Sequence, residues 1–164
     1  IKVCKINTKM TTAEQSLTAT FRVVAFPVEK LTLAVPIESV YRVLSEIPVE
    51  GSGERGVGVA HLEDYELTVF DLEYQLFPHK PSEPISAPAG SYIVVVQSKA
   101  EVLGLLVKQR PTLMNLPRDR VRVLPPSYRQ ADTLTVCSHV AVLEEAEAET
   151  KTVFLLEVEQ LFHS

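Results

Sequence analysis

A glycine-rich segment near the middle of the chain has the spacing of a phosphate-binding loop. Gly51–Gly56 matches Gly-x-Gly-x-x-Gly, which holds a dinucleotide pyrophosphate when a strand precedes it and a helix N-terminus follows it. Asp71 lies about 20 residues after the first glycine, where such sites place an acidic ribose ligand. Here, however, residues 57–62 follow with a fourth glycine and the apolar density of a strand. The segment is therefore predicted to be a turn.

Other side chains with catalytic or metal-binding chemistry are dispersed along the chain. Glu63, Asp64 and Glu66 resemble paired carboxylates, but at a hairpin tip such residues are usually solvated. Cys4 and Cys137 form no Cys-x-x-Cys pair, and Cys137 on an alternating strand is interpreted as a small core residue. No two histidines have a metal-ligand spacing; they stand at 61, 79, 139 and 163. We therefore expect no catalytic residue, no metal and no cofactor.

The composition indicates a globular, non-nucleic-acid-binding domain. The chain has 164 residues, of which 46% are hydrophobic, 23% are charged and 7% are aromatic. This balance is typical of folded domains, and the aliphatic bias favours strands. The formal net charge is −5, and no dense Lys/Arg stripe is present, which argues against binding to a phosphate backbone. No apolar run approaches the length of a membrane span.

The first half of the chain is predicted to contain two hairpins. Residues 20–28 and 31–36 form the first, and Pro27 indicates an edge or a strand end because it lacks an N–H donor. Residues 58–70 form the second, and Asp71 is placed to cap a short helix after it. Between them, the apolar residues of 37–44 recur at helical spacing, but β-branching makes a weak helix and an extended conformation is the alternative.

The second half restarts after a proline-rich segment. Four prolines fall within residues 78–90, which predicts a linker or long loop. Further strands are predicted in the apolar runs at 92–96, 102–107, 113–116, 121–124 and 134–143, the acidic residues 144–149 form a solvated turn, and residues 152–162 close the chain. About ten short strands with little helix predict an all-β protein.

A short internal repeat supports two similar halves. Thr68–Glu73 and Thr152–Glu157 share five of six residues, and Gln-Leu-Phe follows soon after each. A strand running into a short amphipathic helix near the end of each half suggests two related sub-barrels.

The ordered motifs of this chain resemble those of the CheW family, the bacterial adaptors that couple chemoreceptors to the histidine kinase CheA. The resemblance spans roughly residues 20–162. Tyr92–Val96 resembles the Arg-Ile-Ile-Val-Val strand of the family, and Gly104–Val107 the start of its Gly-Leu-Val-Asp motif. The hairpin at 58–72 fits the pattern Gly-Val-x-Asn-Leu-Arg-Gly-x-x-x-Pro-Val-x-Asp-Leu at Gly58, Val59, Leu62, Val69, Asp71 and Leu72. The opening Phe…Ala-Ile-Pro-Ile-x-x-Val motif is matched by Phe21, Phe26, Ala34, Val35, Ile37 and Val40.

The resemblance implies an all-β, CheW-like fold of two small SH3-like five-stranded barrels. We expect an N-terminal tail at 1–19 and a CheW-like domain at 20–164. Within that domain, the first barrel takes residues 20–77 together with packing from the C-terminal segment, and the linker takes 78–90. The second barrel takes 91–151, and 152–164 is a closing segment that packs as an integral element.

The resemblance also implies partner-binding positions and shows where this chain departs from them. Partner binding is expected at Ile37, Val40, Arg42, Gly58 and Glu63, although core packing is the alternative for Ile37 and Val40, and a backbone constraint for Gly58. Arg42 and Glu63 stand where the family tends to have Glu and Arg, so we expect a salt bridge of inverted polarity between them. Lys108 replaces the Asp of Gly-Leu-Val-Asp.

The implied function is that of a cytoplasmic, non-enzymatic adaptor. Its expected partners are a CheA-type histidine kinase and the cytoplasmic tip of a methyl-accepting chemoreceptor, with no nucleic acid and no membrane insertion. Inverted charges would dedicate it to a divergent receptor or kinase. Two alternatives remain open: a regulatory domain of a larger kinase or receiver fusion, and a β-barrel protein that binds a small ligand.

Overall fold

The computed structural model describes residues 19–52, 56–77, 85, 87–99, 101–129, 134–145, 147 and 149–163. The predicted N-terminal tail at 1–19 lies outside these residues except for Ala19. Most of the proline-rich segment 78–90 lies outside them as well.

Strands dominate both halves of the chain, as predicted. The first half contains β1 (Thr20–Val28), β2 (Leu31–Pro36), the 3-10 turn η1 (Ile37–Ser39), β3 (Val40–Ser45), β4 (Glu50–Gly51), β5 (Val57–His61), β6 (Glu66–Asp71) and α2 (Leu72–Leu76). The second half contains β7 (Tyr92–Gln97), β8 (Val102–Val107), β9 (Thr112–Pro117), η2 (Arg118–Arg120), β10 (Val121–Val123), α3 (Pro126–Arg129), β11 (Cys137–Glu144), β12 (Thr150–Leu156) and η4 (Val158–His163). The all-β prediction is confirmed.

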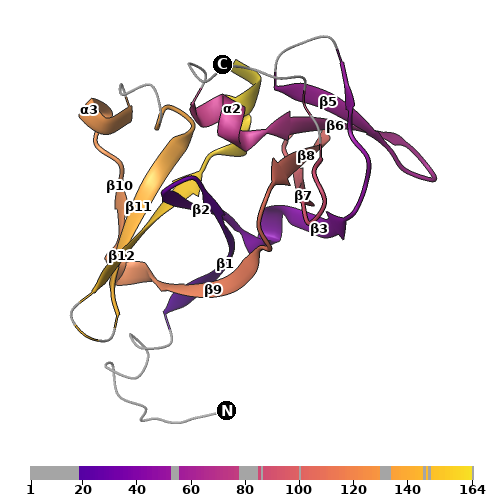
Figure 1. The fold of residues 1–164 in the computed structure, drawn as a ribbon. Coiled ribbons are helices and arrows are strands. Elements are labelled where there is room, and N and C mark those ends of the chain that lie inside the picture. The colour runs from indigo at the N-terminus through magenta and orange to yellow at the C-terminus, as the bar shows by residue number, and fades with distance from the viewer. Residues whose placement is uncertain are drawn as a thin grey trace, which may run out of the picture.

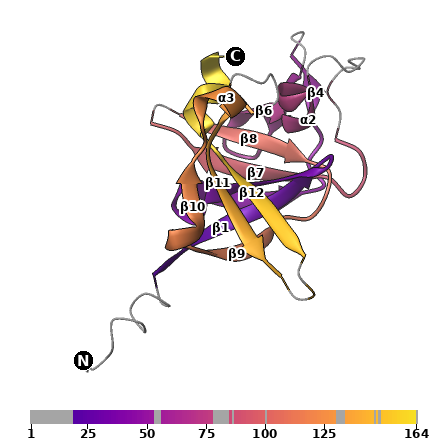
Figure 2. The ribbon, with the colours of Figure 1, turned by 90° about the vertical axis from the view of Figure 1, so that its left-hand side faces the viewer.

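Two sheets form the two SH3-like barrels of the fold. In one sheet the strand order is β10-β11-β12-β2-β1-β9, and in the other it is β3-β7-β8-β6-β5-β4. Each sheet has six strands, one more than expected, because the short edge strands β4 and β10 take part. The sheets lie beside each other, and the β5–β6 hairpin projects from the second (Figure 1). β10, β11 and β12 lie side by side on the face away from that hairpin (Figure 2).

The sheets divide the chain differently from two successive barrels split at residues 78–90. The β1–β2 hairpin joins the last four strands, whereas β3 to β8 form the other sheet. The reason lies in two parallel pairings: β2 pairs with β12, and β6 pairs with β8. Parallel neighbours cannot be joined by a tight hairpin. Accordingly, β1 and β2 of the first half pair within the sheet of β9 to β12, and β7 and β8 of the second half pair within the sheet of β3 to β6.

The internal repeat of the sequence matches a repeat in topology. Read from their β10 and β4 edges, the sheets run β10-β11-β12-β2-β1-β9 and β4-β5-β6-β8-β7-β3, so β12 and β6 occupy equivalent places. Val153 of β12 pairs with the parallel strand β2, and Val69 of β6 pairs with the parallel strand β8. Each of these parallel partners belongs to a hairpin from the other half of the chain. The helix expected after each repeat is α2 in the first half and the 3-10 segment η4 in the second.

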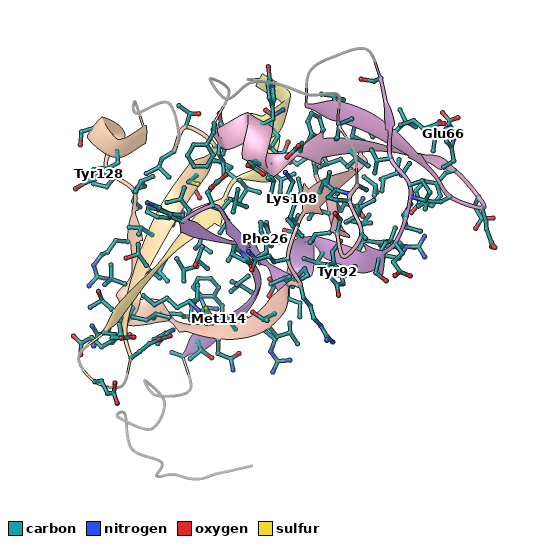
Figure 3. The ribbon with its side chains drawn as sticks, in the orientation of Figure 1. Phe26, Glu66, Tyr92, Lys108, Met114 and Tyr128 are labelled. Atoms are coloured by element: carbon teal, nitrogen blue, oxygen red, sulfur yellow. The ribbon has the colours of Figure 1, made fainter. Side chains whose placement is uncertain are left out.

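Residues of the central strands alternate between two cores. Val94 and Val96 of β7 belong to a core shared by both sheets, whereas Ile93 and Val95 belong to the interior of their own barrel. The shared core also contains Phe26, which lies between the sheets (Figure 3). Because both faces of the strand are buried, its sequence is an unbroken apolar run. The closing segment packs into the shared core through Leu156, Val158 and Leu161, as predicted.

Residues 37–44 adopt the extended alternative and not the helix. Only Ile37–Ser39 form a 3-10 turn, and the chain then pairs as edge strand β3 with β7. The register shifts between Val40 and Arg42, so Tyr41 occupies a β-bulge. β-Branched residues favour a strand over a helix, and here cross-strand pairing outweighs the apparent helical spacing.

Asp71 caps α2, as predicted. Its Oδ1 accepts hydrogen bonds from the backbone N–H groups of Glu73 and Tyr74, at 3.0 and 3.4 Å. Burial raises the pKa of Asp71 above its ordinary 3.8, against the opposing effect of nearby Lys108. The folded protein therefore holds this proton more tightly than the unfolded chain does.

Substitutions of Asp71 should separate capping from charge. Asp71→Ala loses both interactions and is expected to destabilise the protein by about 1 kcal/mol. Asp71→Asn keeps an acceptor and removes the desolvated charge. Because the pKa of Asp71 is higher in the folded protein than in the unfolded chain, the contribution of Asp71 to stability falls as the pH rises above the ordinary pKa of an aspartate. Urea unfolding at about pH 4 and about pH 7 should show the Asn variant gaining on the wild type as pH rises; the opposite trend would contradict this assignment.

Candidate partner-binding surfaces

Two predicted partner-binding residues, Ile37 and Val40, are partly buried and pack against the core that the sheets share. Ile37 lies in η1 and Val40 begins β3. Both residues therefore fit the core-packing alternative. By packing against the core, they hold the start of edge strand β3 in place.

Gly58, the third predicted residue, is buried on β5, between Gly51 of β4 and Val69 of β6. A Cβ on Gly58 would stand 2.6 Å from Val49 Cγ1, and 2.7 Å from both the Glu50 carbonyl oxygen and Ile85 Cγ2. A Cβ atom does not tolerate neighbours this close, so the Val49 and Ile85 side chains and the Glu50 backbone would all have to shift. The requirement for glycine here is explained by packing alone.

The remaining two predicted residues, Arg42 and Glu63, are exposed on the barrel formed by β3 to β8, but the expected salt bridge between them is not formed. The ion pairs among the described residues do not include one that joins them. Instead, Arg42 Nη2 donates a hydrogen bond to the hydroxyl oxygen of Tyr65, at 3.2 Å. This bond raises the pKa of Arg42, and Asp64 contributes a smaller effect in the same direction. The guanidinium is thus attached to the turn that carries Glu63, through a tyrosine two residues farther on.

Two tyrosines flank Arg42 and complete an exposed cluster, here named the tyrosine–arginine row (Tyr41, Arg42 and Tyr65). Tyr41 is 65% exposed, and its ring centroid lies 5.8 Å from the Arg42 guanidinium carbon, within the range of a cation–π contact. Tyr and Arg are the residues most enriched at energetic centres of protein interfaces. Sequence reasoning missed Tyr41 because helical spacing assigned it to a buried face; the strand alternation with Val40 and the bulge expose it.

A groove lies between the two barrels, where edge strand β3 of one sheet meets edge strand β9 of the other. Its volume is about 280 Å³. It is lined by Val24, Val43, Tyr92, Arg110, Pro111, Thr112 and Leu113. Leu113 is 63% exposed and Val43 is 42% exposed. This inter-barrel groove therefore offers apolar side chains to a partner, and β3 contributes to it and to the tyrosine–arginine row.

His61 contacts two carboxylates at the hairpin end of the barrel formed by β3 to β8. Its Nε2 lies 2.8 Å from Glu50 Oε2, and its Nδ1 lies 3.2 Å from Glu66 Oε1. These contacts connect β4, β5 and β6 across their exposed face; Figure 3 labels Glu66 on the projecting hairpin. His61 thus has a hydrogen-bonding role, and within the described residues no group of three His, Cys, Asp or Glu side chains could hold a metal ion.

Lys108, which departs from the family's Asp, forms a close ion pair. Its Nζ lies 2.6 Å from Glu73 Oε2. The pair borders a pocket of about 270 Å³ between the β1–β2 turn, the start of α2 and the end of β8, which Asp71 and Glu29 also line. Both side chains are partly exposed, so the pair is expected to add less than about 1 kcal/mol to stability.

The glycine-rich segment lacks the context of a nucleotide site. Gly51 ends β4, and the element that follows Gly56 is strand β5, which pairs antiparallel with β4, and not a helix. Cys137 is buried in the shared core, in agreement with its predicted packing role. Within the part of the chain that the structure describes, no helix is long and apolar enough to cross a membrane.

Comparisons with known proteins agree with this geometry. The sequence profile of the CheW-like domain matches residues 22–164. The fold is similar to the crystal structure of the scaffolding protein TtCheW from Thermoanaerobacter tengcongensis, with a TM-score of 0.66, 16% sequence identity and coverage of 84% of each chain. A search of curated protein sequences gave no match.

Proposed function

Because the chain belongs to the CheW-like family of chemotaxis scaffolds and adaptors, we propose that it couples a chemoreceptor to a CheA-type histidine kinase. The observation that carries this proposal is the pair of exposed surfaces that meet at β3, namely the inter-barrel groove and the tyrosine–arginine row. A protein that holds two partners at once raises their effective concentration for each other. The proposed role is binding without catalysis or a cofactor, in the cytoplasm.

The inter-barrel groove is the proposed site for the helical tip of a receptor. Amphipathic helices bind by laying an apolar stripe into an apolar groove. Val43 of β3 and Leu113 of β9 both line the groove and are exposed. They would bury apolar area on binding without loss of existing core contacts.

The tyrosine–arginine row is the proposed site for the kinase. Of the predicted partner-binding residues, Arg42 and Glu63 are retained as contact residues. The other three, Ile37, Val40 and Gly58, are proposed to support the surface without touching the partner. Ile37 and Val40 position β3, and Gly58 allows the close pairing of β4 with β5. Separate sites would let both partners bind simultaneously.

Reconstitution of kinase activity tests this proposal. CheA-type kinase, receptor-containing membranes and the purified protein are combined, and receptor-dependent autophosphorylation is measured. Leu113→Ser is expected to reduce coupling at least roughly tenfold through loss of an apolar anchor, while direct binding of the kinase persists. Because Leu113 is exposed, its stability effect should stay within about 0.5 kcal/mol.

Val123→Ser provides the matched control. Val123 is an equally exposed apolar residue, at 69%, on edge strand β10 of the same sheet, but it does not line the groove. This variant should couple as the wild type does. Absence of any stimulation by the wild-type protein would refute the proposed function, whereas equal losses in both variants would refute the groove as the receptor site.

A further inference from the structure

We propose that the surface around the tyrosine–arginine row selects a kinase with an inverted charge pattern: basic side chains that meet Glu63 and Asp64, and a carboxylate that meets Arg42. This inference rests on the proposed adaptor function and specifies the chemistry of the partner that docks at the row.

The acidic side of the pattern is the turn between β5 and β6. Glu63 and Asp64 are exposed and have no ion pair with any described residue. By contrast, Glu50 and Glu66 on the adjoining strands are both engaged by His61. The two turn carboxylates therefore remain available to cations of a partner.

The basic side of the pattern is Arg42 on β3. One of its N–H groups is bonded to Tyr65, and a guanidinium carries five donors in a rigid planar arrangement. The Tyr65 bond and the contact with Tyr41 hold the side chain in one orientation. A positioned guanidinium with further donors is suited to bidentate binding of a carboxylate.

The tyrosines and the charges would have different roles in binding a partner. Tyr41 and Tyr65 supply the apolar contact area, while charges at the rim of an interface mainly penalise partners of the wrong polarity. A kinase that presents an acidic surface to this turn would be repelled by Glu63 and Asp64. The selected kinase is therefore one with Lys or Arg at that place.

The equivalent turn of the other barrel differs in its local balance of charge. The β11–β12 turn is also acidic, but Arg120 lies 3.7 Å from Glu144 there, and η2 places Arg118 on the same barrel. The sequence of that turn also contains no tyrosine. Of these two turns, as far as the structure describes them, the β5–β6 turn is the one that combines aromatic contact area with unpaired acidic side chains, and Glu149 of the β11–β12 turn serves as a control position.

The test measures binding of the protein to the full-length CheA-type kinase of its own organism. Wild-type affinity is expected to fall as salt rises from about 50 to about 300 mM, because screening weakens exposed charge pairs. Glu63→Lys/Asp64→Lys should bind at least roughly tenfold more weakly at low salt. The neutral variant Glu63→Gln/Asp64→Asn should lie between them, and Glu149→Lys should match the wild type. Thermal unfolding checks that each variant is folded.

The outcomes distinguish this inference from the proposed function. If the wild type binds the kinase but neither salt nor the double substitution weakens binding, the charge pattern is wrong and the adaptor function stands. If the wild type does not bind the kinase at all, the proposed function fails, and this inference fails with it. If Glu149→Lys weakens binding as much as the double variant does, the effect is one of net charge and the inference is overturned.

Discussion

Replacement of Gly58 by alanine is expected to destabilise the protein by about 2 kcal/mol, although it adds a single methyl group. The new Cβ would collide with Val49, Ile85 and the carbonyl oxygen of Glu50, all at 2.6–2.7 Å. Side chains can rotate away from such a contact, but a backbone oxygen in a strand pair cannot. Relief therefore requires β4 to move from β5, at the end of the barrel where the partner surface lies.

Gly51→Ala is the control for this prediction, because Gly51 is the direct register partner of Gly58 and an added Cβ there meets nothing within 4 Å. That variant should be neutral, or more stable by up to about 0.5 kcal/mol, because alanine restricts the unfolded chain. Urea denaturation of both variants measures the difference. Equal stabilities would show that the packing argument for Gly58 is wrong and would reopen a direct contact role.

Replacement of Tyr41 by alanine is expected to weaken kinase binding about thirtyfold, which corresponds to about 2 kcal/mol. Tyr41 is the more exposed of the two tyrosines in the tyrosine–arginine row, and its loss would remove apolar contact area and the ring that lies against Arg42. Tyr65→Phe should have a smaller effect, because it removes only the hydroxyl oxygen that accepts from Arg42. Both substitutions should leave stability within about 1 kcal/mol, since the side chains are on the surface.

Tyr128→Ala is the matched control for the kinase-binding prediction. Tyr128 is 58% exposed on α3, at the end of the molecule away from the β5–β6 hairpin (Figure 3). Isothermal titration of the kinase should give the wild-type affinity for this variant. Similar losses for Tyr41→Ala and Tyr128→Ala would mean that the row is not the kinase site.

Local features of this protein were determined by the sequence itself. The β1–β2 and β5–β6 hairpins, the Asp71 cap and the repeated strand-to-helix segments all depend on neighbours a few residues apart. Turn chemistry, capping and alternation of apolar residues act at that range. The same motifs, in order along the chain, identified the family.

Assignment of strands to sheets was decided by tertiary structure. The apolar run at 92–96 indicates a strand buried on both faces, but many partners satisfy that pattern. Parallel pairing of β2 with β12 joins residues more than a hundred positions apart, and no local signal specifies it. Consequently the two predicted barrels are present, while the predicted succession of chain segments does not match the sheets.

The character of the partner surface was also decided by tertiary structure. The sequence identified Arg42 and Glu63 as altered charges, yet the contact of Arg42 is with Tyr65, and the exposure of Tyr41 depends on the bulge in β3. The first fact results from how an edge strand meets a turn that is not its hydrogen-bonded neighbour, and the second results from the register of that strand against β7. Residue types specify which chemistry is available, but the side chains that meet across a barrel are set by strand register and closure, which involve contacts over the whole chain.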